Sequence, residues 1–213
     1  MDENFSYFLE QMGPAIDVNN VPPSTIERYR GKLPNQLLTY WEEHGWSGYA
    51  DGLFWTVNPQ EYEPVLEAWI GDSPFMEQDA YHIIGRTAFG GLYFWGENTG
   101  NSLQVLPWDA LAFPSAGAAP YIAAGRGEEA MSWFFSTLER ADFELEDDNQ
   151  RPLFTPALRK LGRLKRGEMY GFVPALALGG TATIDHLQKV QAVEHLVILA
   201  QLAPLRVMQS PFG

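Results

Sequence analysis

The residues of this chain best suited to chemistry are its four histidines, which could ligate a metal or act as a general base. They are His44, His82, His186 and His195, and no HExxH or HxxxH spacing occurs. His186 and His195 are nine residues apart, which does not place both on one helical face. Zinc-binding histidines usually occur in such clusters, and the chain has no cysteine to supply thiolates. We therefore predict no metal site and no cofactor.

Other catalytic motifs are also missing. No Gly-x-Ser-x-Gly sequence is present, and Gly85 and Gly90-Gly91 lack the strand–GxGxxG–helix context of a dinucleotide site. These glycines are better interpreted as turn residues with positive φ. A catalytic triad can assemble in space from distant residues, so an enzyme or a small-ligand sensor stays an alternative. The leading prediction is a protein that is not an enzyme.

Acidic residues dominate the charge of the chain, which is −13 overall. Residues 1–80 hold 14 acids and 3 bases, and residues 128–148 hold 8 acids and 1 base. Residues 149–213 reverse the sign, with 3 acids and 8 bases. Direct nucleic-acid binding is disfavoured, because phosphate contacts require a basic surface. Solubility explains the acidity most simply, and attraction of a basic partner such as the DNA groove of a nuclease is the sharper hypothesis.

The candidate partner-binding residues fall into three acidic groups, the first of which includes two aromatic residues. Each group could equally be a solvated face. Trp46 and Tyr49 are the best candidates for exposed aromatic anchors, because they lie in a glycine-rich loop. The groups are Glu42, Glu43, Trp46, Tyr49 and Asp51; Asp72, Glu77 and Asp79; and Glu144, Glu146, Asp147 and Asp148.

Periodicity and turn residues predict the elements that must position these groups. Helices are expected over 2–12, 25–31 with Ser24 as cap, 34–45, 58–69, 128–138, 156–161 and 184–203. Strands are expected over 53–57, 81–88, 92–95 and 102–106, in antiparallel hairpins. The pattern predicts an α+β fold, with a mixed, mainly antiparallel sheet flanked by helices and a smaller C-terminal α+β subdomain packed on it.

A domain boundary is predicted at the polar stretch 144–150, which separates residues 1–143 from residues 150–213. All seven tryptophans lie at or before Trp133, and the net charge changes sign beyond this stretch. No run of about 18 apolar residues is present. The acidic N-terminus lacks the features of a secretory signal. We expect a cytoplasmic protein that does not bind membranes.

Several segments resemble a known pair of domains. Residues 46–59, 81–90 and 92–97 resemble the GAD-like domain, and residues 163–203 resemble the domain that commonly follows it. The second domain is typical of immunity proteins to type VI secretion DNase effectors. Its most distinctive segment here is 167–180, Gly-Glu-Met-Tyr-Gly-Phe-Val-Pro-Ala-Leu-Ala-Leu-Gly-Gly. Together the two resemblances cover nearly the whole chain.

This resemblance implies a cytoplasmic immunity protein that binds a cognate nuclease toxin and prevents DNA cleavage. The toxin would be neutralised by covering its active site or by blocking DNA access beside it. An adaptor for a different protein, or a small-ligand sensor, remains the alternative.

Overall fold

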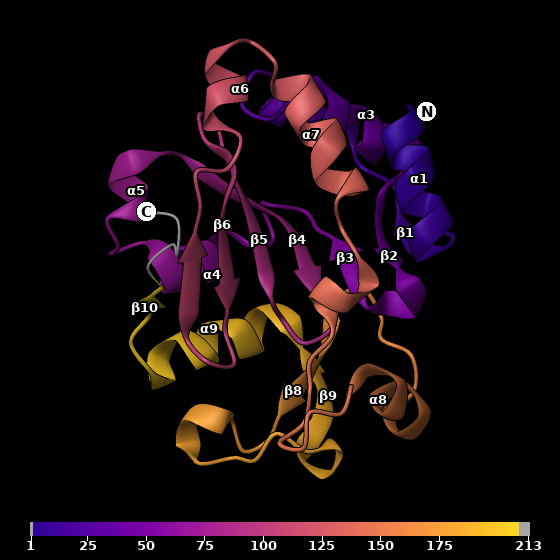
Figure 1. Cartoon of the computed structure of the whole chain (residues 1–213), viewed down its shortest axis with the longest axis vertical. Coiled ribbons are helices and arrows are strands. Elements are labelled where there is room, and N and C mark those ends of the chain that lie inside the picture. The colour runs from indigo at the N-terminus through magenta and orange to yellow at the C-terminus, as the bar shows by residue number, and fades with distance from the viewer. Residues whose placement is uncertain (1, 209–213) are drawn as a thin grey trace.

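An eight-stranded, mainly antiparallel sheet forms the centre of the computed structural model, which describes residues 2–208 (Figure 1). The strand order is β1-β2-β3-β4-β5-β6-β7-β10, and only the β7–β10 pair is parallel. The strands are β1 (Ile16–Asn19), β2 (Trp46–Tyr49), β3 (Phe54–Thr56), β4 (Tyr81–Thr87), β5 (Leu92–Gly96), β6 (Gly100–Leu106), β7 (Leu111–Pro114) and β10 (Arg206–Val207). The predicted α+β class is confirmed.

Helices flank this sheet, and a second sheet of two strands, β8 (Glu168–Phe172) and β9 (Leu187–Gln191), lies beyond one end of it. The α-helices of the described residues are α1 (Glu3–Met12), α2 (Pro23–Tyr29), α3 (Asn35–His44), α4 (Glu63–Ile70), α5 (Phe75–Gln78), α6 (Ala119–Ala123), α7 (Gly127–Ser136), α8 (Phe154–Leu161) and α9 (Ala192–Leu202). Short 3-10 turns are η1 (Ala50–Gly52), η2 (Arg140–Phe143), η3 (Leu176–Leu178) and η4 (Ile184–His186).

The first helix shows how local sequence sets the packing. The Asp2 side chain caps α1 by accepting from the Phe5 amide at 2.9 Å, and Gly13 ends the helix with a φ of 78°. Phe5, Phe8 and Met12 then share its buried face. The Phe8 ring meets Phe54 of β3 edge-on, with ring centroids 6.2 Å apart. The helix therefore covers one face of the sheet, beside α7.

The C-terminal segments pack on the opposite side of β4 and on its end. The Trp69 indole of α4 donates to the Leu196 carbonyl of α9 at 3.0 Å. The Tyr170 amide of β8 donates to the Ala88 carbonyl at 2.8 Å, just past the end of β4. In addition, β10 joins the large sheet by pairing with β7. A division into residues 1–143 and 150–213 remains our prediction.

Two predicted helix boundaries are wrong. Residues 184–191 form η4 and strand β9, and only 192–202 are helical. Residues 187–191 pair with residues 168–172 of β8, and this pairing provides partners for the backbone N–H and C=O groups of both strands. Helix α4 begins at Glu63, because residues 59–62 form a turn that follows Asn58.

Ser24 does not cap the second helix. That helix begins at Pro23 and has Pro22 at the cap position, with no side-chain cap hydrogen bond. Proline is favoured in the first turn because its missing N–H would have no partner there. The sequence pattern also gave no prediction of β1, β2, β7, β10 or α6, which are four strands of at most four residues and a helix of five.

None of the helices within residues 2–208 has the length and apolar character needed to cross a bilayer.

The His195→Gln variant is expected to lose less stability in mild acid than the parent protein. Burial lowers the pKa of His195, which packs in α9 beside Gly171 of β8. The unfolded chain has a histidine pKa of about 6.5, so it binds the proton more readily than the folded chain does. The stability that the buried, neutral imidazole of His195 contributes is therefore fully present above about pH 6.5, and it is lost as the pH falls through the pKa of the folded state. Urea unfolding from pH 7.5 to 5 measures the effect, and identical pH profiles for both proteins would contradict it.

Candidate partner-binding surface

The structure separates the three predicted acidic groups instead of combining them into one patch. The first lies at the end of α3 and in η1, and the second lies around α5, on the opposite side of Figure 1. The third follows η2 and leads into α8. Each group must therefore be assessed separately as a contact for a partner.

In the first group, the acids are exposed but the two aromatic residues are not. Glu42 and Glu43 lie exposed on the last turn of α3. Asp51 is exposed and forms an ion pair of 3.1 Å with Arg163, which ties η1 to the loop before β8. Trp46 and Tyr49 are only 2% and 1% exposed, so the prediction that they are surface anchors is wrong. They occupy β2, a strand whose two faces are both buried.

The second group contains one structural residue and two surface residues. Asp79 is buried and accepts hydrogen bonds from the backbone of Ala80, Asn98 and Thr99. It is therefore occupied in holding the β5–β6 turn. Asp72 and Glu77 are exposed on either side of the start of α5.

The third group is divided in the same way. The Asp147 side chain is 7% exposed and pairs with Arg151 at 2.7 Å, and this pair lowers the pKa of Asp147 to about 2. The Glu144 carboxylate accepts from the Phe154 amide at 2.9 Å and so provides a partner for the first N–H of α8. Glu146 and Asp148 are exposed. Two of the four residues thus serve the fold directly.

The large aromatic side chains that are exposed among the described residues lie elsewhere. They are Tyr7, which is 50% exposed, Tyr121 at 39%, and Phe113 and Trp133 at 37% each. Tyr121 and Trp133 pack edge-on against each other, and Arg126 lies over both rings. Tyr7 and Phe113 instead border two hollows of the surface.

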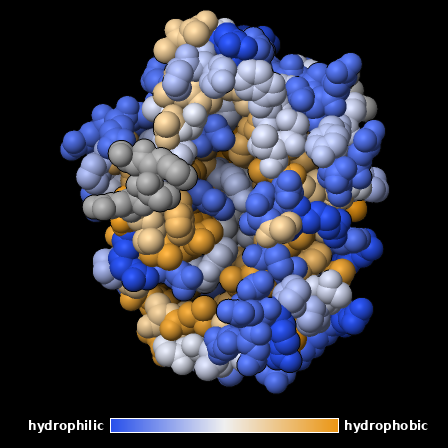
Figure 2. Space-filling view, viewed as in Figure 1, coloured by the Kyte–Doolittle hydropathy of each residue, from blue (hydrophilic) through white to orange (hydrophobic). Residues whose placement is uncertain are grey.

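The first hollow is a groove between the sheet and the segment that follows α7. Its floor is a cross-strand row in which Tyr93 of β5 pairs with Gln104 of β6, and Gln104 pairs with Phe113 of β7. Its far wall is formed by Phe134, Thr137, Leu138 and Asp142. The groove has a volume of about 420 Å³. In Figure 2 it is a hollow near the centre of the face that is turned to the viewer.

One acidic residue, Asp142, stands at the wall of this groove. Asp142 and Glu139 form a capping box at η2, in which the Asp142 carboxylate accepts from the Glu139 amide at 2.9 Å. Both side chains belong to exposed residues, and neither takes part in an ion pair within residues 2–208. Burial, followed by the nearby Asp142 charge, raises the pKa of the Tyr93 phenol, which therefore stays protonated.

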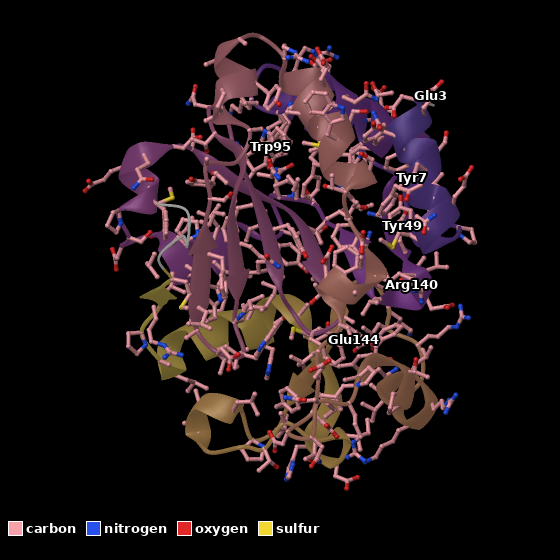
Figure 3. The ribbon with its side chains drawn as sticks, in the orientation of Figure 1. Glu3, Tyr7, Tyr49, Trp95, Arg140 and Glu144 are labelled. Carbon is pink, nitrogen blue, oxygen red and sulfur yellow. The ribbon has the colours of Figure 1, made fainter. Side chains whose placement is uncertain are left out.

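The second hollow lies on the other side of the same connecting segment. It has a volume of about 350 Å³ and is lined by Tyr7 and Gln11 of α1 and by Ser136, Leu138, Glu139, Arg140 and Ala141. Leu138 lines both hollows. Figure 3 shows Tyr7 and Arg140 on the same side of the molecule. Residues 137–142 therefore form a ridge between two recesses, each with an exposed aromatic ring at its border.

Sequence reasoning missed this surface because its parts are far apart along the chain. Phe113 lies in a strand of four residues, and Asp142 lies in a 3-10 turn. Only the register of β5, β6 and β7 places Phe113 beside Tyr93 and Gln104. The one sequence signal for this surface was the spacing of Leu111 and Phe113, two residues apart, which indicates a strand with both side chains on one face.

The described residues contain no group of three or more His, Asp or Glu side chains arranged to hold a metal ion. His82 contacts Glu97 at 2.9 Å and packs edge-on against Tyr29. His186 bonds the hydroxyls of Thr181 and Thr183. These partners account for the two histidines as structural residues.

Comparison with known families gives this surface its context. Residues 3–108 match the GAD-like domain, and residues 128–203 match the family described as T6SS immunity protein Tdi1, C-terminal. The chain carries a GAD-like domain followed by a Tdi1 C-terminal domain. The Tdi1-type match starts at α7, so it includes the wall of the groove, whereas the GAD-like match includes β5 and β6 of the floor.

The whole fold is shared with a solved protein. A crystal structure of Atu4351 from Agrobacterium tumefaciens aligns with a TM-score of 0.86 over 100% of this chain and 95% of that chain. The two sequences are 22% identical, so this similarity establishes the fold alone. No curated protein matches the sequence.

Proposed function

We propose that this GAD-like and Tdi1-type protein is an immunity protein that binds and neutralises a cognate type VI secretion nuclease toxin. The observation that carries the proposal is the match of residues 128–203 to an immunity-protein domain. The resemblance to immunity proteins of DNase effectors supports a DNase as the toxin. We place its action in the cytoplasm of the toxin-producing cell, where an unsecreted nuclease would reach DNA.

Neutralisation would require binding rather than catalysis. A nuclease must present a basic surface to its DNA substrate, because phosphates carry most of the binding free energy. This protein has a net charge of −13, with exposed acids on several surfaces. Opposite charges would accelerate encounter by about 10- to 1,000-fold. A bound inhibitor would then exclude DNA by covering the active site or the substrate channel beside it.

Co-expression with the product of the adjacent reading frame tests the proposal. We expect the two chains to co-purify as a stoichiometric complex in which DNA cleavage is suppressed. Plasmid degradation by the toxin alone, compared with degradation by the complex, is the measurement. Full cleavage in the presence of excess protein would rule out the immunity function. A complex with a non-toxic neighbour would instead support an adaptor.

A further inference from the structure

We propose that the toxin docks in the groove between β5–β7 and the segment 137–142, placing an apolar side chain on Phe113 and a lysine or arginine beside Asp142. This inference rests on the proposed function, and it assigns the interaction surface that the function needs. The groove has three features that favour this occupant: an exposed aromatic ring, the carboxylate of Asp142 and a recess of suitable size.

The aromatic ring is an exposed anchor on a rigid support. Phe113 is 37% exposed although the cross-strand row to which it belongs also contains the half-buried Tyr93 and Gln104. Backbone pairing of β7 with β6 on one side and β10 on the other fixes its position. Burying apolar surface is favourable by about 25 cal/mol per Å². A partner that covers this ring therefore gains affinity with little ordering cost.

The acidic residue of the groove selects a basic partner. Asp142 lines the groove, whereas Glu139, three residues before it, lines the second hollow. One oxygen of Asp142 accepts from the Glu139 amide, which leaves its other oxygen available. Arg140 is the neighbouring base, but it lines the second hollow rather than this groove. A lysine or arginine from the DNA-binding surface of a nuclease would compensate the charge of Asp142, which has no ion-pair partner within residues 2–208.

The recess favours a short protein segment as the occupant. Its volume of about 420 Å³ accommodates a few side chains, and its lining combines apolar and polar groups. Asn101, Gln104, Ser115 and Thr137 provide hydrogen-bonding groups in that lining. The acids on α4 and α5 do not line this groove or the second hollow. The groove therefore combines a recess with the carboxylate of Asp142.

Two groove variants and a matched control pair test this docking site. The groove variants are Phe113→Ser and Asp142→Asn, since asparagine can still accept from the Glu139 amide. The control variants are Met76→Ser and Glu77→Gln on α5, where Met76 is 38% exposed and Glu77 is also exposed. Each pair therefore removes one exposed apolar side chain and one exposed negative charge. Phe113→Tyr keeps the ring and serves as the conservative variant.

The measurement is the Kd and association rate for a catalytically inactive form of the toxin that the co-expression experiment identifies. We expect Phe113→Ser to weaken binding by about 30-fold or more, as removal of an aromatic anchor does. Asp142→Asn should weaken binding by about tenfold, mainly through slower association at low salt. Phe113→Tyr and both controls should stay within about twofold. Circular dichroism and thermal unfolding confirm that all variants remain folded.

The outcomes distinguish the docking site from the function itself. If the parent protein binds the toxin and both groove variants bind equally well, the docking site is overturned and the immunity function stands. If the parent protein does not bind the toxin, both proposals are overturned. If sedimentation shows that the parent dimerises alone and Phe113→Ser does not, the groove holds a second copy and the proposed occupant is wrong. Weaker binding by the controls than by the groove variants would place the toxin on α5.

Discussion

Arg86→Met is expected to lower the free energy of unfolding by about 3 kcal/mol, one of the largest effects of any single side chain here. Arg86 is 0% exposed and stacks on Trp55, with its guanidinium carbon 5.3 Å from the ring centroid. It has no ion-pair partner in the described structure and donates instead to neutral oxygens. These are Tyr62 Oη at 2.8 Å, Thr87 O at 3.1 Å, and Arg166 O and Glu168 O at 2.7 Å each.

Two opposing changes in free energy decide whether Arg86→Met destabilises the protein: the relief of a buried charge and the loss of hydrogen bonds to its acceptors. Replacing a buried ion by an apolar side chain can be neutral, because the burial of the charge is relieved. Here the acceptors are mostly fixed backbone carbonyls of β4 and of the segment that enters β8. Each acceptor left without a donor costs about 1–3 kcal/mol. With four acceptors involved, the loss exceeds the relief.

Urea unfolding followed by tryptophan fluorescence measures the change. Arg159→Met is the matched control, because Arg159 is exposed on α8, and it should alter the free energy of unfolding by less than about 0.5 kcal/mol. Equal stability of Arg86→Met and the parent would show that the carbonyls find other donors. Since Arg86 links β4 to the start of β8, the variant should also be cleaved by protease around β8 at a lower urea concentration than the parent.

Asp79→Ala is expected to lower the free energy of unfolding by about 2–4 kcal/mol. The Asp79 carboxylate accepts from five donors around the β5–β6 turn: the amides of Ala80, Asn98 and Thr99, the Asn98 side-chain amide and the Thr99 hydroxyl. Alanine would leave these five donors without the carboxylate that they share, and the two donors of Thr99 are half-buried. Asp72→Ala removes an exposed acid from the turn between α4 and α5; it is the control and should be nearly neutral.

The same carboxylate predicts a second, pH-dependent signature. Burial alone would raise the pKa of Asp79, but the hydrogen bonds from Thr99, Asn98 and Ala80 outweigh it, and the pKa is lowered. The stability that the ionised Asp79 carboxylate contributes is therefore present above about pH 4, the pKa of aspartate in the unfolded chain. It is lost as the pH falls through the pKa of the folded state. Unfolding of Asp79→Asn between pH 5 and pH 2.5 should show a shallower decline than the parent shows. A parallel decline would mean that other groups carry the acid sensitivity.

Local patterns in the sequence were sufficient for the fold class and for the longest elements. Phe5, Phe8 and Met12 recur at helical spacing before Gly13, and the structure confirms a helix there. The alternating strands around Asn98-Thr99-Gly100 are confirmed as the β5–β6 hairpin. Such elements are specified by residues within a few positions of one another, so that their periodicity is visible without tertiary contacts. The distinctive segment 167–180 similarly pointed to the immunity-protein domain that residues 128–203 match.

Tertiary structure decided which of the singled-out residues are available to a partner. Trp46 and Tyr49 lie in a glycine-rich stretch, yet packing against Trp41 and Phe8 removes them from the surface. Asp79 looks like its exposed neighbours in sequence, but its donors Asn98 and Thr99 lie about twenty residues away, and only folding brings them near. Conversely, the groove unites Tyr93, Phe113 and Asp142 from three separate segments. Composition determines that the chain is acidic. Strand register and long-range packing determine which acidic side chain lies beside an exposed ring, because they depend on contacts between residues that are far apart along the chain.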